Sequence, residues 1–301
     1  MKHSHPWLRV RVLLFVLLAV SFTASADAAR KPSKAGIASA HGLATEAGLE
    51  ILKQGGNAFD AAVAVSAALA VVEPSSSGLG GGAFWLLHRA SDGFETMVDA
   101  REVAPRAATR EMFLDENRNV VRGRSTVTAL AAGIPGEAAG FAHIAEKYGR
   151  LPLRTSLQPA IRLAREGFPL NARLRGGIQA KRDLFNEGAA AKVFLLNGEV
   201  PPLETVIKQP DLARVLTALA DNGPDAFYEG ATARRLVDGV RKLGGIWSLE
   251  DLGAYEIKER KPVYGEYRGA RIISAPPPSS GGVALVDALN ILSGFDMSTL
   301  D

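Results

Sequence analysis

Residues 73–105, EPSSSGLGGGAFWLLHRASDGFETMVDAREVAP, decide the fold of this chain. The stretch begins with a serine- and glycine-rich loop, 75–82, whose small side chains allow a close approach to the backbone. Two apolar runs, 83–89 and 94–100, flank Ser91-Asp92-Gly93, a pattern that predicts a β-hairpin. Arg101 follows the second run directly, so we expect a rigid strand end to aim its side chain into a cleft.

The glycine pattern Gly78-x-Gly80-x-x-Ala83 resembles a dinucleotide-binding fingerprint, but its context is reversed. That fingerprint needs a strand before the glycines and a helix after them, so that the helix N-terminus faces the pyrophosphate. Here a helical pattern precedes the glycines and the strand-like run Phe84-Trp85-Leu86-Leu87 follows them. The sequence therefore argues against nucleotide binding, and we expect no cofactor.

The first 26 residues have the pattern of a secretory signal peptide. Basic residues lead into the apolar run 12–20, and Ala24-Ser25-Ala26 offers a cleavage site. An uncleaved anchor is the alternative, but this run is shorter than the roughly 20 residues that span a bilayer. We therefore expect an exported protein, periplasmic or secreted, with residues 27–301 as its mature part.

Composition excludes several function classes. The formal charge of +3 comes from three basic residues of the leader, so residues 27–301 carry no net charge and give no electrostatic case for nucleic acid. The chain has no cysteine and its three histidines beyond the leader stand in unrelated contexts, so we expect no metal site. With 301 residues and 47% hydrophobic content, the chain can bury a large core.

Helical patterns surround the hairpin. Apolar spacing predicts a helix over 40–54, ended by Gly55-Gly56. Asn57 then suits an N-cap, with Asp60 as its capping-box partner. The next run, 58–72, is almost wholly small and apolar, which indicates a helix buried on all sides.

The remainder of the chain adds helices and a second hairpin. Further predicted elements are a helix from Gly136 to Tyr148, helices over 156–166 and 210–220, a capping box at 248–251, a hairpin of 262–267 with 270–275, and a last helix through Leu292. Pro159 is expected in the first turns of the 156–166 helix. This order argues for an α+β fold with antiparallel strands.

Six blocks, in order, resemble the γ-glutamyltranspeptidases, also called glutathione hydrolases. They cover nearly all of residues 36–296. The blocks are GGNAFDAAVA (55–64), VEPSSSGLGGG (72–82), DAREVAP (99–105), PGEAAG (135–140), 209–230 and PPPSSGG (276–282). No single block identifies the family, but six blocks in the order in which the family has them are a specific signal.

The resemblance implies an N-terminal nucleophile hydrolase with an αββα sandwich, of which this chain would supply the incomplete large-subunit portion. Such a precursor cuts itself and frees a threonine, which attacks the γ-glutamyl amide of compounds such as glutathione. The acyl group then passes to water or to an amino acid or peptide amine. The free α-amine can serve as base for its own hydroxyl, so no histidine is required.

Arg101 is the one site residue that the resemblance carries over, as the group that holds the α-carboxylate of the γ-glutamyl moiety. A planar guanidinium suits a carboxylate because it offers two charge-assisted hydrogen bonds. A structural ion pair with Asp99 or Glu102 is the alternative. The serines at 75–77 and 279–280 lie in no Gly-x-Ser-x-Gly elbow, so we expect them to form turns rather than act as nucleophiles.

The family's Thr-Thr-His processing site is absent from residues 1–301. The resemblance therefore implies that the nucleophilic threonine lies beyond Asp301. We expect no catalytic residue in this chain, inactivity of the chain alone, and a small subunit as partner. Two alternatives remain at this point. One is a related acylase or a poly-γ-glutamate-processing enzyme of the same superfamily, and the other is a non-catalytic exported binding protein.

Overall fold

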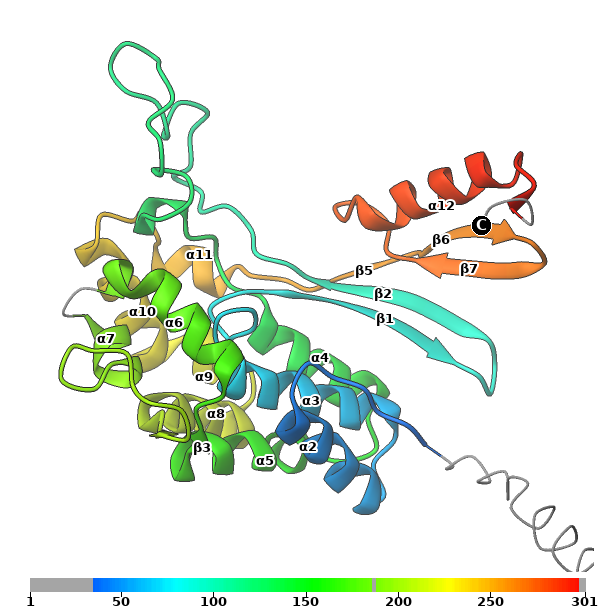
Figure 1. Ribbon diagram of the computed structural model, residues 1–301, viewed down its shortest axis with the longest axis horizontal. Helices are drawn as coiled ribbons and strands as arrows, with labels where there is room; N and C mark the ends of the chain where they lie inside the picture. Colours follow the sequence, from blue (N-terminus) through cyan, green and yellow to red (C-terminus); the bar gives the residue numbers. More distant parts are fainter. Residues whose placement is uncertain (1–34, 186–187, 298–301) are drawn as a thin grey trace, which may run out of the picture. The chain divides into compact units, whose positions relative to one another are not determined.

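A computed structural model describes residues 35–185 and 188–297 (Figure 1). The predicted signal peptide, 1–26, lies outside these residues. So does Asp301, and the expectation that the nucleophile follows it stays a prediction. The chain divides into a short unit, 1–37, and a main unit, 38–301, and the elements below belong to the main unit. Helices are mixed with antiparallel strands, which confirms the α+β class.

Two helices lead into the glycine-rich loop. α2 (Gly42–Lys53) and α3 (Ala58–Val72) lie within two residues of their predicted bounds. At the start of α3, the Asn57 side chain accepts the Asp60 N–H and the Asp60 carboxylate accepts the Asn57 N–H, which confirms the capping box. Nine of the 15 residues of α3 are buried, as its small and apolar composition predicts.

The central sheet has the order β1-β2-β5. β1 (Ala83–Arg89) and β2 (Phe94–Ala100) form the predicted hairpin, with Ala83 opposite Ala100. β5 (Lys258–Arg260) pairs with the other edge of β2. The sequence does not predict β5, because three consecutive charged residues carry no alternation of apolar and polar positions.

Glu259 anchors β5 to α4 (Glu137–Tyr148), a helix that the sequence predicts. One carboxylate oxygen lies 2.7 Å from His143 Nε2, 2.8 Å from Lys147 Nζ and 2.6 Å from the Tyr148 hydroxyl oxygen. Burial opposes ionisation of Glu259, but the hydrogen bonds from Lys147, Tyr148 and His143 outweigh it and lower its pKa to about 2. The strand is therefore held by a carboxylate that stays charged at neutral pH.

Two further predicted helices follow. α8 (Pro210–Asn222) begins with the proline that the sequence places at the first turn. α5 (Leu153–Glu166) begins three residues earlier than predicted, so Pro159 lies inside the helix rather than in its first turn. The predicted start was too late because Pro159 suggested a helix start nearby, whereas Pro152 stands at the N-cap.

Several elements of the middle of the chain have weak local signals, and the sequence alone does not predict their bounds. They are β3 (Phe168–Pro169), α6 (Ala172–Phe185), α7 (Ala189–Phe194), β4 (Val206–Ile207), α9 (Asp225–Tyr228) and α10 (Gly230–Lys242). β3 and β4 form a two-residue antiparallel pair. These elements pack mainly through buried aliphatic and aromatic side chains of the core.

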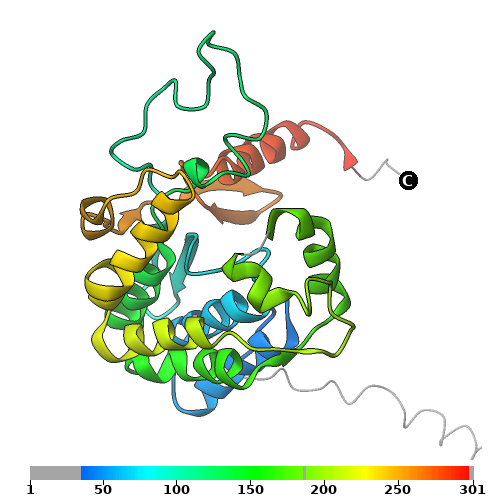
Figure 2. The same cartoon turned by 90° about the vertical axis from the view of Figure 1, so that its left-hand side faces the viewer.

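The C-terminal part contains the second predicted hairpin. β6 (Val263–Tyr267) pairs with β7 (Ala270–Ser274), and α12 (Gly281–Leu292) lies along them (Figure 1). α12 contacts both strands. Between β2 and α4, residues 106–132 form a long loop with one short 3-10 turn, Ala129–Ala131 (Figure 2). In the part of the chain that the structure describes, no helix has the length and apolar character to cross a membrane.

Candidate functional site

The loop between α3 and β1 forms the wall of a surface hollow. The Glu73 carbonyl accepts the N–H groups of Ser76 and Ser77 at 2.9 and 3.0 Å, so these serines form a turn at the end of α3. That they are not nucleophiles stays a prediction. The hollow has a volume of about 410 Å³ and is lined by Pro74, Ser75, Ser76, Ser77, Gly78, Gly80, Gly81, Gly82 and Glu102.

Gly82 lies directly against the end of β2. A Cβ atom at this position would overlap the Ala100 carbonyl oxygen and lie 2.8 Å from Arg101 Cα, so a larger residue requires β2 to move. The Gly81 carbonyl accepts the N–H groups of Gly136 and Glu137, at 2.9 and 3.2 Å. The glycine-rich loop, the end of β2 and the start of α4 therefore meet around Arg101.

Arg101 directly follows β2, as the sequence predicts, and its side chain is exposed. It is next to Glu102, which lines the hollow, but is not itself among the lining residues, so its role in binding stays a prediction. Its guanidinium carbon lies 5.8 Å from the centroid of the Phe84 ring, and within residues 35–185 and 188–297 this side chain makes no ion pair. The pairing with Asp99 that the sequence left open is not formed, because the Asp99 carboxylate contacts Arg260 Nε at 2.7 Å. Glu102 does not pair with Arg101 either and instead lines the hollow. The guanidinium is therefore free to bind an anion.

The backbone of Arg101 is held on both sides. Its N–H donates to the Asp99 carboxylate at 3.0 Å, and its carbonyl accepts the Tyr255 hydroxyl at 2.9 Å. Sequence reasoning missed Tyr255 and Arg260, which lie far downstream of β2 and carry no local signal that connects them with Arg101. Their neighbour in the chain, the capping box of α11 (Leu249–Gly253), is formed as predicted.

Glu137 is a buried acid beneath the loop. Its carboxylate accepts the Ser66 hydroxyl at 2.7 Å, and the residue is 3% exposed. Burial raises the pKa of Glu137 to about 7, against the opposing effect of hydrogen bonds from Ser66 and the Gly78 N–H. The sequence places Glu137 in a family block but gives no sign of this environment.

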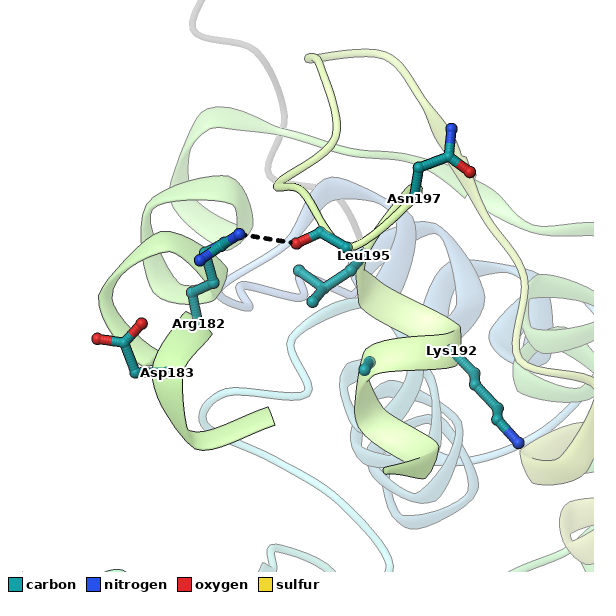
Figure 3. A pocket seen from close by; sticks show the side chains of 7 residues that line it. Arg182, Asp183, Lys192, Leu195 and Asn197 are labelled. Carbon is teal, nitrogen blue, oxygen red and sulfur yellow. Dashed lines mark hydrogen bonds between the residues drawn. The ribbon is translucent and has the colours of Figure 1, made fainter. Parts of the chain in front are cut away.

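A larger hollow, of about 590 Å³, lies between α6, α7 and the turn that follows α7 (Figure 3). Arg182 and Lys192 are the cations that line it, and Arg182 already donates to the Gly198 carbonyl at 3.0 Å and to the Glu199 carboxylate at 2.8 Å. No residue predicted from the sequence lines this hollow. Among the described residues there is also no group of three potential metal ligands. The hollow beside Arg101 is therefore the better candidate site.

Comparison with known proteins decides the family. A family model described as Gamma-glutamyltranspeptidase matches residues 44–301. The chain belongs to the γ-glutamyltranspeptidase family. This confirms the resemblance drawn from the six blocks, and it places the chain in an enzyme family of the N-terminal nucleophile hydrolase superfamily.

Individual relatives and a solved structure support the assignment of this chain to the γ-glutamyltranspeptidase family. The glutathione hydrolase proenzyme of Escherichia coli (strain K12) is 45% identical over 263 residues, which are 87% of this chain and 45% of the relative. The acylase ACY 1 proenzyme of Pseudomonas sp. (strain SE83) is 40% identical over 86% of this chain and 48% of its own length. The crystal structure of Helicobacter pylori γ-glutamyltranspeptidase superimposes with a TM-score of 0.87 at 41% identity, over 90% of this chain and 78% of that one. The chain thus spans about half the length of the curated relatives.

Proposed function

We propose that the complete protein is an exported γ-glutamyltransferase/glutathione hydrolase, and that Arg101 binds the α-carboxylate of its γ-glutamyl donor. The observation that carries the proposal is the exposed guanidinium of Arg101 after the end of β2, which has no ionic partner among the described residues and lies beside a hollow lined mainly by small residues. The relatives named glutathione hydrolase support the reaction class.

Arg101 suits this task because its guanidinium is planar and always charged. It can donate two parallel hydrogen bonds to one carboxylate, which fixes the orientation of the donor as well as binding it. The Phe84 ring beneath the guanidinium supports the side chain without neutralising its charge. The γ-carbonyl carbon is three single bonds from the α-carbon, so this contact would limit the distance of the γ-carbonyl from Arg101.

The attacking group belongs to polypeptide beyond Asp301 in this proposal. Self-cleavage would free a threonine whose α-amine takes the proton from its own hydroxyl, and the hydroxyl oxygen would attack the γ-carbonyl. The amide nitrogen leaves with a proton, and water or an amine then releases the γ-glutamyl group. The same polypeptide would supply the small subunit and the rest of the αββα sandwich, while residues 1–26 would direct export.

Substitution of Arg101 in the complete proenzyme tests the assignment. R101A removes two charge-assisted hydrogen bonds and should raise KM for a γ-glutamyl anilide by about 100-fold or more, since each such bond contributes about 1.5–3 kcal/mol. R101K keeps the positive charge but loses the two parallel N–H donors of the guanidinium, so a KM between those of the wild type and R101A is expected. Self-cleavage should survive both changes. Arg110→Ala, at an exposed position of the 106–132 loop, is the matched control and should leave KM unchanged.

An unchanged KM for R101A would contradict the assignment. The acylase relative motivates one further comparison, with a 4-aminobutanoyl anilide, which lacks only the α-carboxylate. Equal kcat/KM for the two anilides would favour an acylase of broader substrate range. Absence of self-cleavage and of any turnover by the complete protein would favour a non-catalytic binding protein. Residues 27–301 alone are expected to give no turnover.

A further inference from the structure

The Tyr255 hydroxyl connects the region after α11 with the end of β2. It donates to the Arg101 carbonyl at 2.9 Å, while the Asp99 carboxylate accepts the Arg101 N–H at 3.0 Å. Asp99 is held in turn by Arg260. The peptide groups on both sides of Arg101 Cα are therefore fixed by side chains, whereas the guanidinium itself has no polar partner among the described residues.

Tyr255 is itself held in place. Its ring is stacked on the ring of Tyr228, with centroids 5.5 Å apart and an interplanar angle of 6°. The Tyr228 hydroxyl donates to the Pro135 carbonyl at 3.0 Å and accepts the Ala139 N–H at 3.2 Å, so this second ring is locked to the start of α4. The position of the Tyr255 hydroxyl is thus set by the buried core and not by a flexible surface loop.

Gly136 shows how closely these groups are packed. A Cβ atom at this position would overlap both the Tyr255 hydroxyl and the Ala100 carbonyl oxygen. Only glycine leaves room for the hydroxyl to reach Arg101 beside the backbone of α4. Burial, followed by the nearby anions Asp99 and Glu102, raises the pKa of Tyr255, so its hydroxyl remains a hydrogen-bond donor at neutral pH.

α11 holds the same stretch of chain at a second point. The Asp251 carboxylate accepts the Arg106 N–H at 2.9 Å, and Arg106 also forms an ion pair with Glu250. The segment that leaves β2 is therefore attached to the α11 region at Arg101 and again at Arg106. Loss of the Tyr255 contact alone would leave the second attachment, so the effect should be local to Arg101.

We propose that Tyr255 is a positioning residue for Arg101: its hydroxyl fixes the Arg101 carbonyl and so the direction from which the guanidinium reaches the donor α-carboxylate. This inference rests on the proposed function and deepens it, because it names a second residue on which recognition of the α-carboxylate depends. Without the hydroxyl, the peptide group after Arg101 can rotate. The guanidinium then spends part of its time out of alignment with the carboxylate.

The test uses the self-cleaved complete enzyme and two donors, the γ-glutamyl anilide and the 4-aminobutanoyl anilide that lacks the α-carboxylate. Y255F removes one hydroxyl and keeps the stacked ring. It should raise KM for the γ-glutamyl anilide about three- to tenfold, the effect of one hydrogen bond, with kcat within about twofold. The kcat/KM for the 4-aminobutanoyl anilide should not change. The double variant R101A/Y255F should have a KM for the γ-glutamyl anilide no higher than that of R101A, because the two residues act through one contact.

The ratio of kcat/KM for the two donors is independent of the active fraction of a preparation, so partial misfolding of Y255F cannot mimic the expected pattern. Tyr267→Phe, at the end of β6, is the matched control and should behave as the wild type. Equal losses with both donors, no loss with either, or a Y255F variant without a folded fraction would each overturn the inference. Absence of wild-type turnover would overturn the proposed function, and the inference with it.

Discussion

Glu137 illustrates how a single residue couples the candidate site to pH. Its carboxyl group lies between Ser66 of α3 and the Gly78 N–H of the loop, so it connects the helix beneath the site with the glycines that line it. Burial disfavours the charged form, and its pKa rises from 4.5 to about 7. A protonated carboxyl group can donate one hydrogen bond and accept others, whereas the carboxylate only accepts.

The direction of the resulting pH dependence follows from proton binding. Between pH 4.5 and 7 the folded protein binds the Glu137 proton and the unfolded chain does not, so this residue lowers stability as the pH rises through that range. The loss should be on the order of 3 kcal/mol by pH 8. E137Q, which cannot ionise, should remove this part of the slope when the free energy of urea unfolding is measured at pH 5 and pH 8. Glu146→Gln, exposed on the same helix, should keep it. A wild-type slope in E137Q would show that Glu137 is ionised throughout.

At the scale of elements, the close approach of the glycine-rich loop to β2 determines the site. Gly82 is in contact with the backbone of Ala100 and Arg101, whereas Gly80, two residues earlier, has no atom within 4 Å of the position of a Cβ. The two glycines belong to the same loop and line the same hollow. They therefore form a matched pair for substitution.

G82A should displace the end of β2, because backbone atoms cannot yield as a flexible side chain can. Overpacking of this kind costs about 1–3 kcal/mol, and a lowered Tm together with a raised KM for the γ-glutamyl anilide is expected in the complete enzyme. G80A should leave both within error of the wild type. Equal behaviour of the two variants in thermal melts would show that the loop moves freely against β2.

Prediction from the sequence succeeded where the signal was local. The Asp92-Gly93 turn and the Asn57–Asp60 capping box lie within a few residues of the elements that they define, and β1, β2 and α3 have their predicted bounds. The contacts that complete the site connect residues 154 and 161 positions apart, Arg101 with Tyr255 and Asp99 with Arg260. No periodicity or cap in a single sequence encodes such pairings, so the sequence predicts Arg101 as a site residue but not the side chains that hold its backbone.

At the scale of the whole molecule, α12 contacts the β6–β7 hairpin and exposes further apolar side chains around its axis. Val286 packs against Gly265 of the β6–β7 hairpin, while Val283, Leu285 and Ile291 remain 49%, 43% and 59% exposed. A helix that is apolar on both sides is typical of an interior layer. Because the chain spans about half the length of its relatives, we infer that polypeptide outside residues 1–301 covers these exposed side chains in the complete protein.

Ile291→Glu tests whether α12 is covered, because the substitution should help isolated 27–301 and harm the complete proenzyme. In isolated 27–301 the new charge interrupts exposed apolar surface and should raise solubility. In the complete proenzyme it would be buried without a partner, which should reduce the folded yield and cost about 3 kcal/mol or more in stability. The neighbouring Asn290→Glu, which adds the same charge at a polar exposed position, should be neutral in both. Normal yield and Tm for I291E in the complete proenzyme would mean that α12 faces solvent there.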